Sequence, residues 1–409
     1  MAETHRNSHN ADQREAGRHQ VLHTIRNAGS IARIDIARQA QVSPATVTTI
    51  TSELLDAGLI EEIVPDNGHA EVNQSAKRGR PRVALRIRGD AHLIAGMKIT
   101  DKLVTVILLD FDGNTVADHS EPLASAVLSS EHLVAAIKRA IGNATVAIGR
   151  QISDISGLGI GLSGLVDATR NFVHWSPSLT TRNVELGALL HAALPFACFV
   201  DNDANLVAKA EHQFGNGRGQ SDFIVITIEK GVGMGIILNN QIYRGARGCG
   251  AEFGHTKVQL GGALCRCGQR GCLEAYVGDY ALLREANIRS SAQPENDLAA
   301  LYADAQAGDA MAKSIFDRAS NMFAMGLANV INIFDPKLVI LSGEQMAFDF
   351  LYSPTVFENV RSSVVQVDTI LPEIQVHKWG DLMWAKGAAA YAIEQVSNAT
   401  IQRLAANVA

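Results

Sequence analysis

One short segment gathers most of the cysteines of this chain. Three of its five cysteines lie within 18 residues of a histidine, in a glycine-rich stretch. The four residues are His255, Cys265, Cys267 and Cys272. One imidazole and three thiols are the ligand set of a closed tetrahedral zinc site, and glycines let so short a backbone fold around one ion. Unrelated free cysteines are the alternative, but only Cys198 and Cys249 lie elsewhere. We therefore expect structural Zn²⁺, with no open position for a catalytic water.

Polar residues that suit a hydroxylated ligand occur close to this segment. Glu252 and Glu274 flank it, and upstream the apolar run 196–200 leads into the sequence Asp-Asn-Asp-Ala-Asn at 201–205. Polar side chains at the carboxyl end of a strand face the ligand crevice in open α/β sheets. Carboxylates and amides there donate to and accept from several hydroxyls at once. Helix capping is the alternative role for Asn202, Asp203 and Asn205.

These segments together carry a family resemblance. The run 202–205, the Gly-Ala-Glu-Phe-Gly-His run at 250–255 and the Cys-x-Cys-Gly-x-x-Gly-Cys-Leu-Glu signature at 265–274 resemble the ROK family of sugar kinases and sugar-responsive transcriptional repressors. The resemblance covers roughly residue 91 to the C-terminus. It implies a two-lobed, actin-like (ribonuclease H-like) α/β fold of the sugar-kinase type.

The resemblance also implies roles for individual residues. In family kinases the residue that matches Asp203 is the base that deprotonates the sugar hydroxyl. Residues matching Asn202, Glu252, His255 and Glu274 hold the sugar. The zinc ligands of the family match His255, Cys265, Cys267 and Cys272. For a protein that does not transfer phosphate, Asp203 becomes a vestigial base position and a hydrogen-bond acceptor for sugar.

The N-terminal region has a pattern that a sugar kinase does not need. Apolar spacing predicts helices around 21–26 and 34–40, and a third that Ser43 caps and Pro44 begins. Val47, Ile50 and Leu54 would be buried on one side of the third helix. The other side presents small or polar residues, Ser43, Thr46, Thr48, Thr49, Ser52 and Glu53. This is a helix-turn-helix whose last helix reads DNA, although an oligomerisation hairpin would show the same periodicity.

The next segment adds a wing. The runs 59–64 and 83–87 read as two strands around a polar loop, which with the helices predicts a winged helix-turn-helix. Residues 77–88 carry six positive charges and no negative charge. Within this run Arg78, Arg80 and Arg82 suit phosphates or a narrow minor groove. A solvated surface is the ordinary alternative for such a run, and the adjacent helix-turn-helix favours DNA.

Charge and composition agree with this division. Residues 1–90 hold 12 Lys and Arg against 11 Asp and Glu, while the rest of the chain holds 24 against 31. We expect a disordered tail over 1–13, the DNA-binding domain over 14–90 and the sugar-binding and dimerisation domain over 91–409. No apolar run is long enough to cross a membrane and no leader precedes the helices. Free thiols gathered for a metal indicate a reducing cytoplasm.

The glycine turns that hold ATP in family kinases are altered. Phosphate cradles need backbone N–H groups that side chains do not obstruct. Lys98 stands where the kinases have an acid, and Glu229 and Glu344 bring negative charge to the second and third turns. We therefore predict that the chain is not an active kinase. The sugar site also differs, because Ser178 stands where family members often have an asparagine.

The sequence thus predicts a cytoplasmic, sugar-responsive transcriptional regulator, a repressor of carbohydrate uptake or catabolism genes. Its partners would be operator DNA, a small sugar effector and further copies in a homodimer or a dimer of dimers, with no membrane. An ATP-dependent sugar kinase with an appended DNA-binding domain is one alternative. A regulator that a protein partner removes from DNA is the other.

Overall fold

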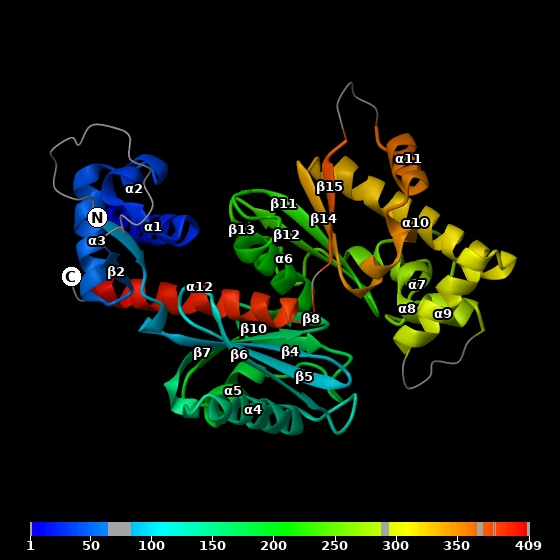
Figure 1. The fold of residues 1–409 in the computed structure, drawn as a ribbon, viewed down its shortest axis with the longest axis horizontal. Coiled ribbons are helices and arrows are strands. Elements are labelled where there is room, and N and C mark those ends of the chain that lie inside the picture. The colour runs from blue at the N-terminus through cyan, green and yellow to red at the C-terminus, as the bar shows by residue number, and fades with distance from the viewer. Residues whose placement is uncertain are drawn as a thin grey trace, which may run out of the picture.

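The structure, a computed structural model, describes residues 2–63, 83–287, 294–365, 371–378, 380 and 382–406. A small N-terminal domain lies against one end of a two-lobed body, and each lobe is built on a five-stranded sheet (Figure 1). The C-terminal helix α12 (Met383–Ala406) crosses the body and reaches the N-terminal domain.

The N-terminal domain is the expected winged helix-turn-helix. It contains α1 (Ala2–Ala28), β1 (Ile31–Ala32), α2 (Arg33–Gln39), α3 (Pro44–Asp56), β2 (Ile60–Ile63) and β3 (Ala84–Ile87). The Ser43 hydroxyl accepts the Thr46 N–H at 3.1 Å and Pro44 is the first residue of α3, as predicted. The strand β1 was not predicted. It pairs with β3, so the sheet has the order β1-β3-β2.

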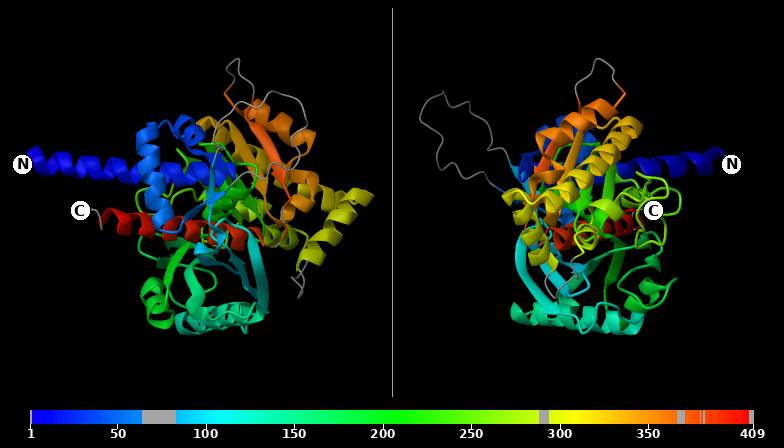
Figure 2. Two further views of the ribbon diagram at one scale, coloured as in Figure 1. Left: turned by 60° about the vertical axis from the view of Figure 1, so that its left-hand side comes forward. Right: turned by 90° about the vertical axis from the view of Figure 1, so that its right-hand side faces the viewer.

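The N-terminal tail differs from its prediction. The tail over 1–13 was expected to be disordered, whereas the structure begins α1 at Ala2, and the start of α1 projects beyond the body (Figure 2). Extending an existing helix costs far less than nucleating one, and the polar composition of a segment does not report this. The basic residues Arg78, Arg80 and Arg82 lie outside the described residues.

The first lobe has a mixed sheet of order β10-β7-β4-β5-β6. Its strands are β4 (Leu93–Ile99), β5 (Leu103–Leu109), β6 (Thr115–Pro122), β7 (Ile155–Leu162) and β10 (Ala197–Asn202). Helices α4 (Ser130–Ala147) and α5 (Leu186–Ala193) cover one face, and α12 covers the other (Figure 1). Successive side chains of β5 point to opposite faces of the sheet, so Val106 packs toward α4 and Ile107 packs toward α12. The short strands β8 (Leu165–Asp167) and β9 (Phe172–Trp175) form a hairpin.

The second lobe repeats this plan around the sheet β13-β12-β11-β14-β15. Its strands are β11 (Phe223–Ile228), β12 (Val232–Leu238), β13 (Gln241–Ile242), β14 (Leu338–Ser342) and β15 (Glu373–His377). Helix α6 (Asp203–Phe214) covers one face and α10 (Ala310–Phe334) the other. The remaining helices are α7 (Glu274–Val277), α8 (Asp279–Glu285), α9 (Pro294–Ala307) and α11 (Pro354–Ser363). Each lobe is therefore a five-stranded sheet covered by helices, which gives the two-lobed fold that the resemblance implied.

Helices α6 and α12 cross between the lobes at very close range. A Cβ on Gly387 of α12 would lie 1.9 Å from the Leu206 carbonyl oxygen of α6. A Cβ on Gly159 of β7 would lie 1.8 Å from the Ala388 carbonyl oxygen. Glycine therefore allows α12 to rest directly on both the first-lobe sheet and α6. The crossing also carries an ion pair between Lys209 of α6 and Glu394 of α12.

The N-terminal domain and the first lobe share one apolar core. Val21, Leu22 and Ile25 of α1 belong to the same buried cluster as Phe111 of the first lobe and Ile393 of α12. This cluster crosses the domain boundary expected at residue 90. The DNA-binding domain is thus packed onto the first lobe rather than suspended from a linker.

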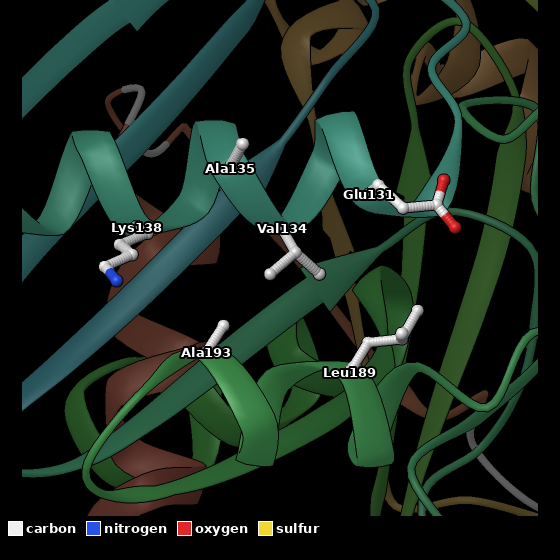
Figure 3. A pocket seen from close by; sticks show the side chains of 6 residues that line it. All are labelled: Glu131, Val134, Ala135, Lys138, Leu189 and Ala193. Carbon is white, nitrogen blue, oxygen red and sulfur yellow. The ribbon is translucent and has the colours of Figure 1, made fainter.

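A shallow pocket lies on the outer face of the first lobe, far from α12. It has a volume of about 320 Å³ and lies between α4 and α5, with Val134 and Leu189 at its centre (Figure 3). Among the described residues, no helix is long and apolar enough to cross a membrane.

Candidate ligand and metal sites

The predicted metal ligands converge in the structure. The ligand atoms of His255, Cys265, Cys267 and Cys272 all lie within 4.8 Å of one another. The His255 Nδ1 to Cys265 Sγ distance is 3.7 Å, and so is the Cys267 Sγ to Cys272 Sγ distance. Bonds of about 2.3 Å to a tetrahedral zinc would place sulfurs about 3.8 Å apart. The cluster can therefore hold one tetrahedral metal ion without rearrangement.

The loop around the cluster is shaped by glycine and balanced by a lysine. Gly271 has φ +77°, and a Cβ there would lie 1.7 Å from the Gln259 carbonyl oxygen. The Lys257 ammonium donates to Cys272 Sγ at 3.0 Å. Three thiolates on a divalent ion leave one net negative charge, which this ammonium offsets. The sequence motif did not include Lys257, because its position two residues after His255 has no characteristic signal.

His255 joins the metal cluster to the candidate sugar residues. Its Nδ1 faces Cys265, while its Nε2 lies 3.9 Å from Glu252 Oε2. A metal on Nδ1 would fix the imidazole and leave the Nε2 proton directed toward Glu252. Glu274 begins α7 two residues after Cys272, and its carboxylate accepts from Tyr280 at 3.3 Å.

Asn202 and Asp203 lie at the junction of β10 and α6. The Asn202 side-chain oxygen caps α6 by accepting the N–H groups of Ala204 and Asn205 at 2.9 and 3.4 Å. Its amide also donates to the Gly164 carbonyl at 2.9 Å. The capping alternative therefore describes Asn202 as the structure shows it, with one amide N–H left for a ligand. Asp203 accepts a hydrogen bond from Ser163, so the turn that follows β7 reaches the same place.

Three of the predicted residues share one electrostatic environment. Burial, together with the nearby charges of Asp203 and Glu274, raises the pKa of Glu252 to about 7. Carboxylates from α6, from the loop after β13 and from α7 thus face a common space. Several acceptors in one place suit a ligand with several hydroxyls, whose donated hydrogen bonds relieve the repulsion. We refer to Asn202, Asp203, Glu252, His255 and Glu274 as the candidate sugar site.

Arg244 supports this site and was not predicted. Its Nε and Nη2 donate to Asp201 Oδ2 at 3.0 and 2.5 Å, and Asp201 is fully buried. The other oxygen of Asp201 accepts from Asn205 at 2.9 Å. This pair ties the start of the loop that carries Glu252 to the strand that ends in Asn202. An arginine before a glycine-rich run has no sequence signal for such a role, since its partner is 43 residues away.

The phosphate-loop region, residues 96–101, 229–233 and 342–344, is filled by the protein's own charges. Lys98 Nζ lies 3.6 Å from Glu229 Oε2 and 3.6 Å from the centroid of the Trp384 ring. Burial raises the pKa of Glu229 to about 8, with Glu344 among the charges that raise it. Lys230 pairs with Asp101 across the lobes. The lysine and glutamates that the sequence singled out are thus brought together.

The predicted DNA-reading side of α3 is open to solvent. Ser43, Thr46, Thr48, Thr49 and Ser52 are all exposed, while Val47, Ile50 and Leu54 are buried. The hydroxyls of Thr48 and Thr49 donate to carbonyls one turn earlier, at 2.9 and 3.3 Å. Glu53 is half-buried and pairs with Arg18 of α1 at 2.7 Å, so it supports the domain core. An exposed row of small polar side chains fits a major groove.

Comparison with known proteins decides the family. A model described as the ROK family matches residues 95–395. The chain belongs to the ROK family. A model of the MarR family matches residues 15–63, so the N-terminal domain is a winged helix of that type. The ROK assignment agrees with the two-lobed fold and with the cysteine signature.

Several relatives are regulators. The chain is 28% identical over 363 residues to the DNA-binding transcriptional dual regulator NagC of Escherichia coli, covering 87% of each chain. It is 27% identical over 389 residues to the xylose repressor of Caldicellulosiruptor bescii, covering 92% of this chain and 95% of that one. A ROK family transcriptional regulator described as a homologue of the E. coli protein Mlc has a TM-score of 0.76 at 25% identity, over 96% of this chain and 99% of that one.

Kinases of the family match the body alone. The glucokinase of Streptomyces coelicolor is 32% identical over 266 residues, covering 61% of this chain and 81% of the enzyme. The glucokinase of Streptomyces griseus in complex with glucose and AMPPNP has a TM-score of 0.62 at 29% identity, over 74% of this chain and 99% of that one. Membership of the family therefore does not by itself separate regulator from enzyme.

Proposed function

We propose that this chain is a sugar-responsive DNA-binding transcriptional regulator, a repressor of genes for carbohydrate uptake or catabolism. One observation carries the proposal: the same chain presents an exposed α3 face and a candidate sugar site, while Lys98 and Glu229 fill the phosphate-loop region. Such an arrangement supports binding of DNA and sugar without transfer of phosphate. Asp203 then serves as an acceptor for a sugar hydroxyl.

The sugar is the ligand whose chemistry fits the candidate site. Asp203, Glu252 and Glu274 offer carboxylate oxygens, and Asn202 retains one amide N–H. The panel consists of N-acetylglucosamine, glucose and xylose. These sugars appear in the names of relatives: the N-acetylglucosamine repressor of Shigella flexneri, the glucokinases and the xylose repressor. We expect one of them to raise the melting temperature of the full chain, because a ligand of the folded state stabilises it by mass action. Ser178 replaces a frequent asparagine of the family, so the preference among the three is an open outcome of the panel.

We infer that the metal of the cluster is zinc and that it is structural. Cys265 and Cys272 are buried, and four protein ligands leave no position for a reacting water. The ion would hold His255 and the neighbouring Glu274 in place. Elemental analysis of protein purified without chelators should give one zinc per chain. Less than half an equivalent would contradict a permanent structural ion.

The DNA contacts of the proposal are of two kinds. The α3 face would read base edges, and Thr49→Ala should weaken a preferred operator by about 1–3 kcal/mol more than random DNA. Arg80, outside the described residues, would contact phosphates or the minor groove. Arg80→Ala should weaken both DNAs alike and reduce the salt dependence by roughly one unit of slope. If Thr49→Ala lowers the affinity for the preferred operator and for random DNA equally, α3 does not read the base sequence.

Assembly with further copies is part of the proposal, whereas control by a protein partner is an alternative to it, and each has its own test. A homodimer, or a dimer of dimers, would place two α3 helices on successive major grooves. Sedimentation of the full chain with and without operator DNA measures the copies bound. Release from DNA that requires a cell extract and no panel sugar would favour the protein-partner alternative.

A further inference from the structure

We propose that the contact between the end of α6 and the end of α1 is a latch through which sugar binding in the body alters the DNA-binding domain. The inference rests on the proposed function and names its route of regulation. We define the latch as His212 and Arg218 of the second lobe with His23 and Asn27 of α1.

The first observation is where α6 begins and ends. Asn202 caps its first turn and Asp203 is its first residue, both in the candidate sugar site. Twelve residues of α-helix span about 18 Å, and the helix ends near α1. Most of its middle residues are buried against the second-lobe sheet and α12. A displacement imposed on its first turn is therefore carried to its other end rather than absorbed within it.

The second observation is what the far end of α6 touches. The rings of His212 and His23 are stacked with centroids 6.3 Å apart. Four residues after α6 ends, the Arg218 guanidinium donates to the Asn27 main-chain carbonyl at 2.7 Å. Asn27 is in the last turn of α1, whose carbonyls have no partner within the helix, and a cation there is favourable. The second lobe therefore contacts the DNA-binding domain directly.

The third observation is that α1 is bound to the two lobes in different ways. Its apolar residues Val21, Leu22 and Ile25 lie in the core shared with the first lobe, and Arg26 lies 4.9 Å from the centroid of the Phe111 ring. Its polar contacts with the second lobe use the exposed His23 and the exposed Arg218, and Phe214 at the end of α6 packs, partly buried, against the shared core. Buried apolar packing resists displacement far more than one exposed hydrogen bond does. If the lobes rotate, α1 should follow the first lobe, and the latch should be the contact that changes.

The sugar can drive such a rotation because its candidate ligands come from both sides of the lobe junction. Asn202 ends a first-lobe strand, whereas Glu252 and Glu274 belong to second-lobe loops. A ligand that contacts all three favours the interlobe angle at which they fit it best. The latch then carries part of the free energy that couples sugar to DNA, a coupling that acts equally in both directions.

The test uses the full chain, an operator selected by the protein, and N-acetylglucosamine, glucose and xylose as probes. Operator dissociation constants are measured by fluorescence anisotropy with and without each sugar, and sugar dissociation constants by calorimetry. The variants are His23→Ala, Arg218→Ala and the pair together. His191→Ala and Arg150→Ala change exposed residues of the same types on the first lobe, away from the latch. The quantity compared is the ratio of operator dissociation constants with and without sugar.

We expect the paired latch variant to reduce this ratio at least threefold, with each single change giving a part of the loss. Sugar dissociation constants should change less than threefold, and both control variants should keep the wild-type ratio. A wild-type ratio retained by the paired variant would overturn the latch and leave the proposed function standing. If no probe changes the operator affinity of the wild type although one binds, sugar responsiveness itself fails, and the latch fails with it.

Discussion

The metal cluster and the phosphate-loop region differ in what their polar and charged side chains contact. In the metal cluster, the ligand atoms of one histidine and three cysteines lie within 4.8 Å of one another and could hold one ion. In the phosphate-loop region, Lys98 Nζ lies 3.6 Å from Glu229 Oε2 and 3.6 Å from the centroid of the Trp384 ring. The side chains of the metal cluster suit an added ion, whereas Lys98 in the phosphate-loop region contacts other side chains of the protein.

This difference supports the proposed function, in which the chain binds a sugar and does not transfer phosphate. On that proposal, ligand recognition depends on the metal loop, which carries His255 and leads into Glu274 at the start of α7. Phosphoryl transfer requires unobstructed backbone N–H groups and positive charge on the phosphates. A half-buried lysine held beside Glu229 and over the Trp384 ring is less available to a phosphate.

The largest expected effect is on the metal side. Cys272→Ser should remove the ion, lower the melting temperature by more than 5 °C and weaken sugar binding more than tenfold, because Cys272 is fully buried and directly precedes the segment carrying Glu274. Calorimetry and elemental analysis measure these effects. Cys198→Ser, a thiol outside the cluster, should keep the metal. A metal-free Cys272→Ser protein with normal sugar affinity would show that the candidate sugar site does not depend on the metal loop.

The sequence predicted that the four metal-ligating residues lie together and where α3 begins. Metal ligands lie close together along the chain, so spacing alone constrains them, and Ser43 with Pro44 marked the start of α3. Long-range pairs had no such signal. Arg244 contacts Asp201, and Lys98 contacts Trp384, only in the folded chain, because the partners are far apart in the sequence. The same holds for the core shared by α1 and the first lobe, which crosses the boundary expected at residue 90.

A smaller effect is expected at the position of the former base. Asp203→Asn keeps the shape of the side chain and removes its charge, so sugar affinity should fall about tenfold, the value of one charged hydrogen bond at roughly 1.4 kcal/mol. Calorimetry with the probe that binds the wild type measures this change. The first-lobe variant Asp118→Asn serves as a control. Unchanged affinity would mean that Asp203 does not contact the sugar.

The smallest effect concerns the phosphate-loop region and depends on pH. The pKa of Glu229 is raised to about 8 from its ordinary value near 4.5, chiefly by burial. The folded state therefore holds this proton more tightly than the unfolded state, and stability is lost as pH rises from about 4.5 to 8. Glu229→Gln should reduce that loss by roughly 1–2 kcal/mol in denaturant unfolding. The exposed variant Glu358→Gln should leave the slope unchanged, and a Glu229→Gln slope equal to wild type would contradict an enclosed carboxyl.

The most direct test of the proposed function measures DNA release and sugar phosphorylation in the same sample. Full-length protein, labelled operator, magnesium-ATP and the panel sugar that binds are combined; anisotropy reports DNA release while chromatography reports sugar phosphate. We predict that the sugar changes operator affinity and that no sugar phosphate accumulates. Turnover near ~1 per second that disappears in Asp203→Ala, within the ordinary range for enzymes, would show that the phosphate-loop region still works and would contradict the account.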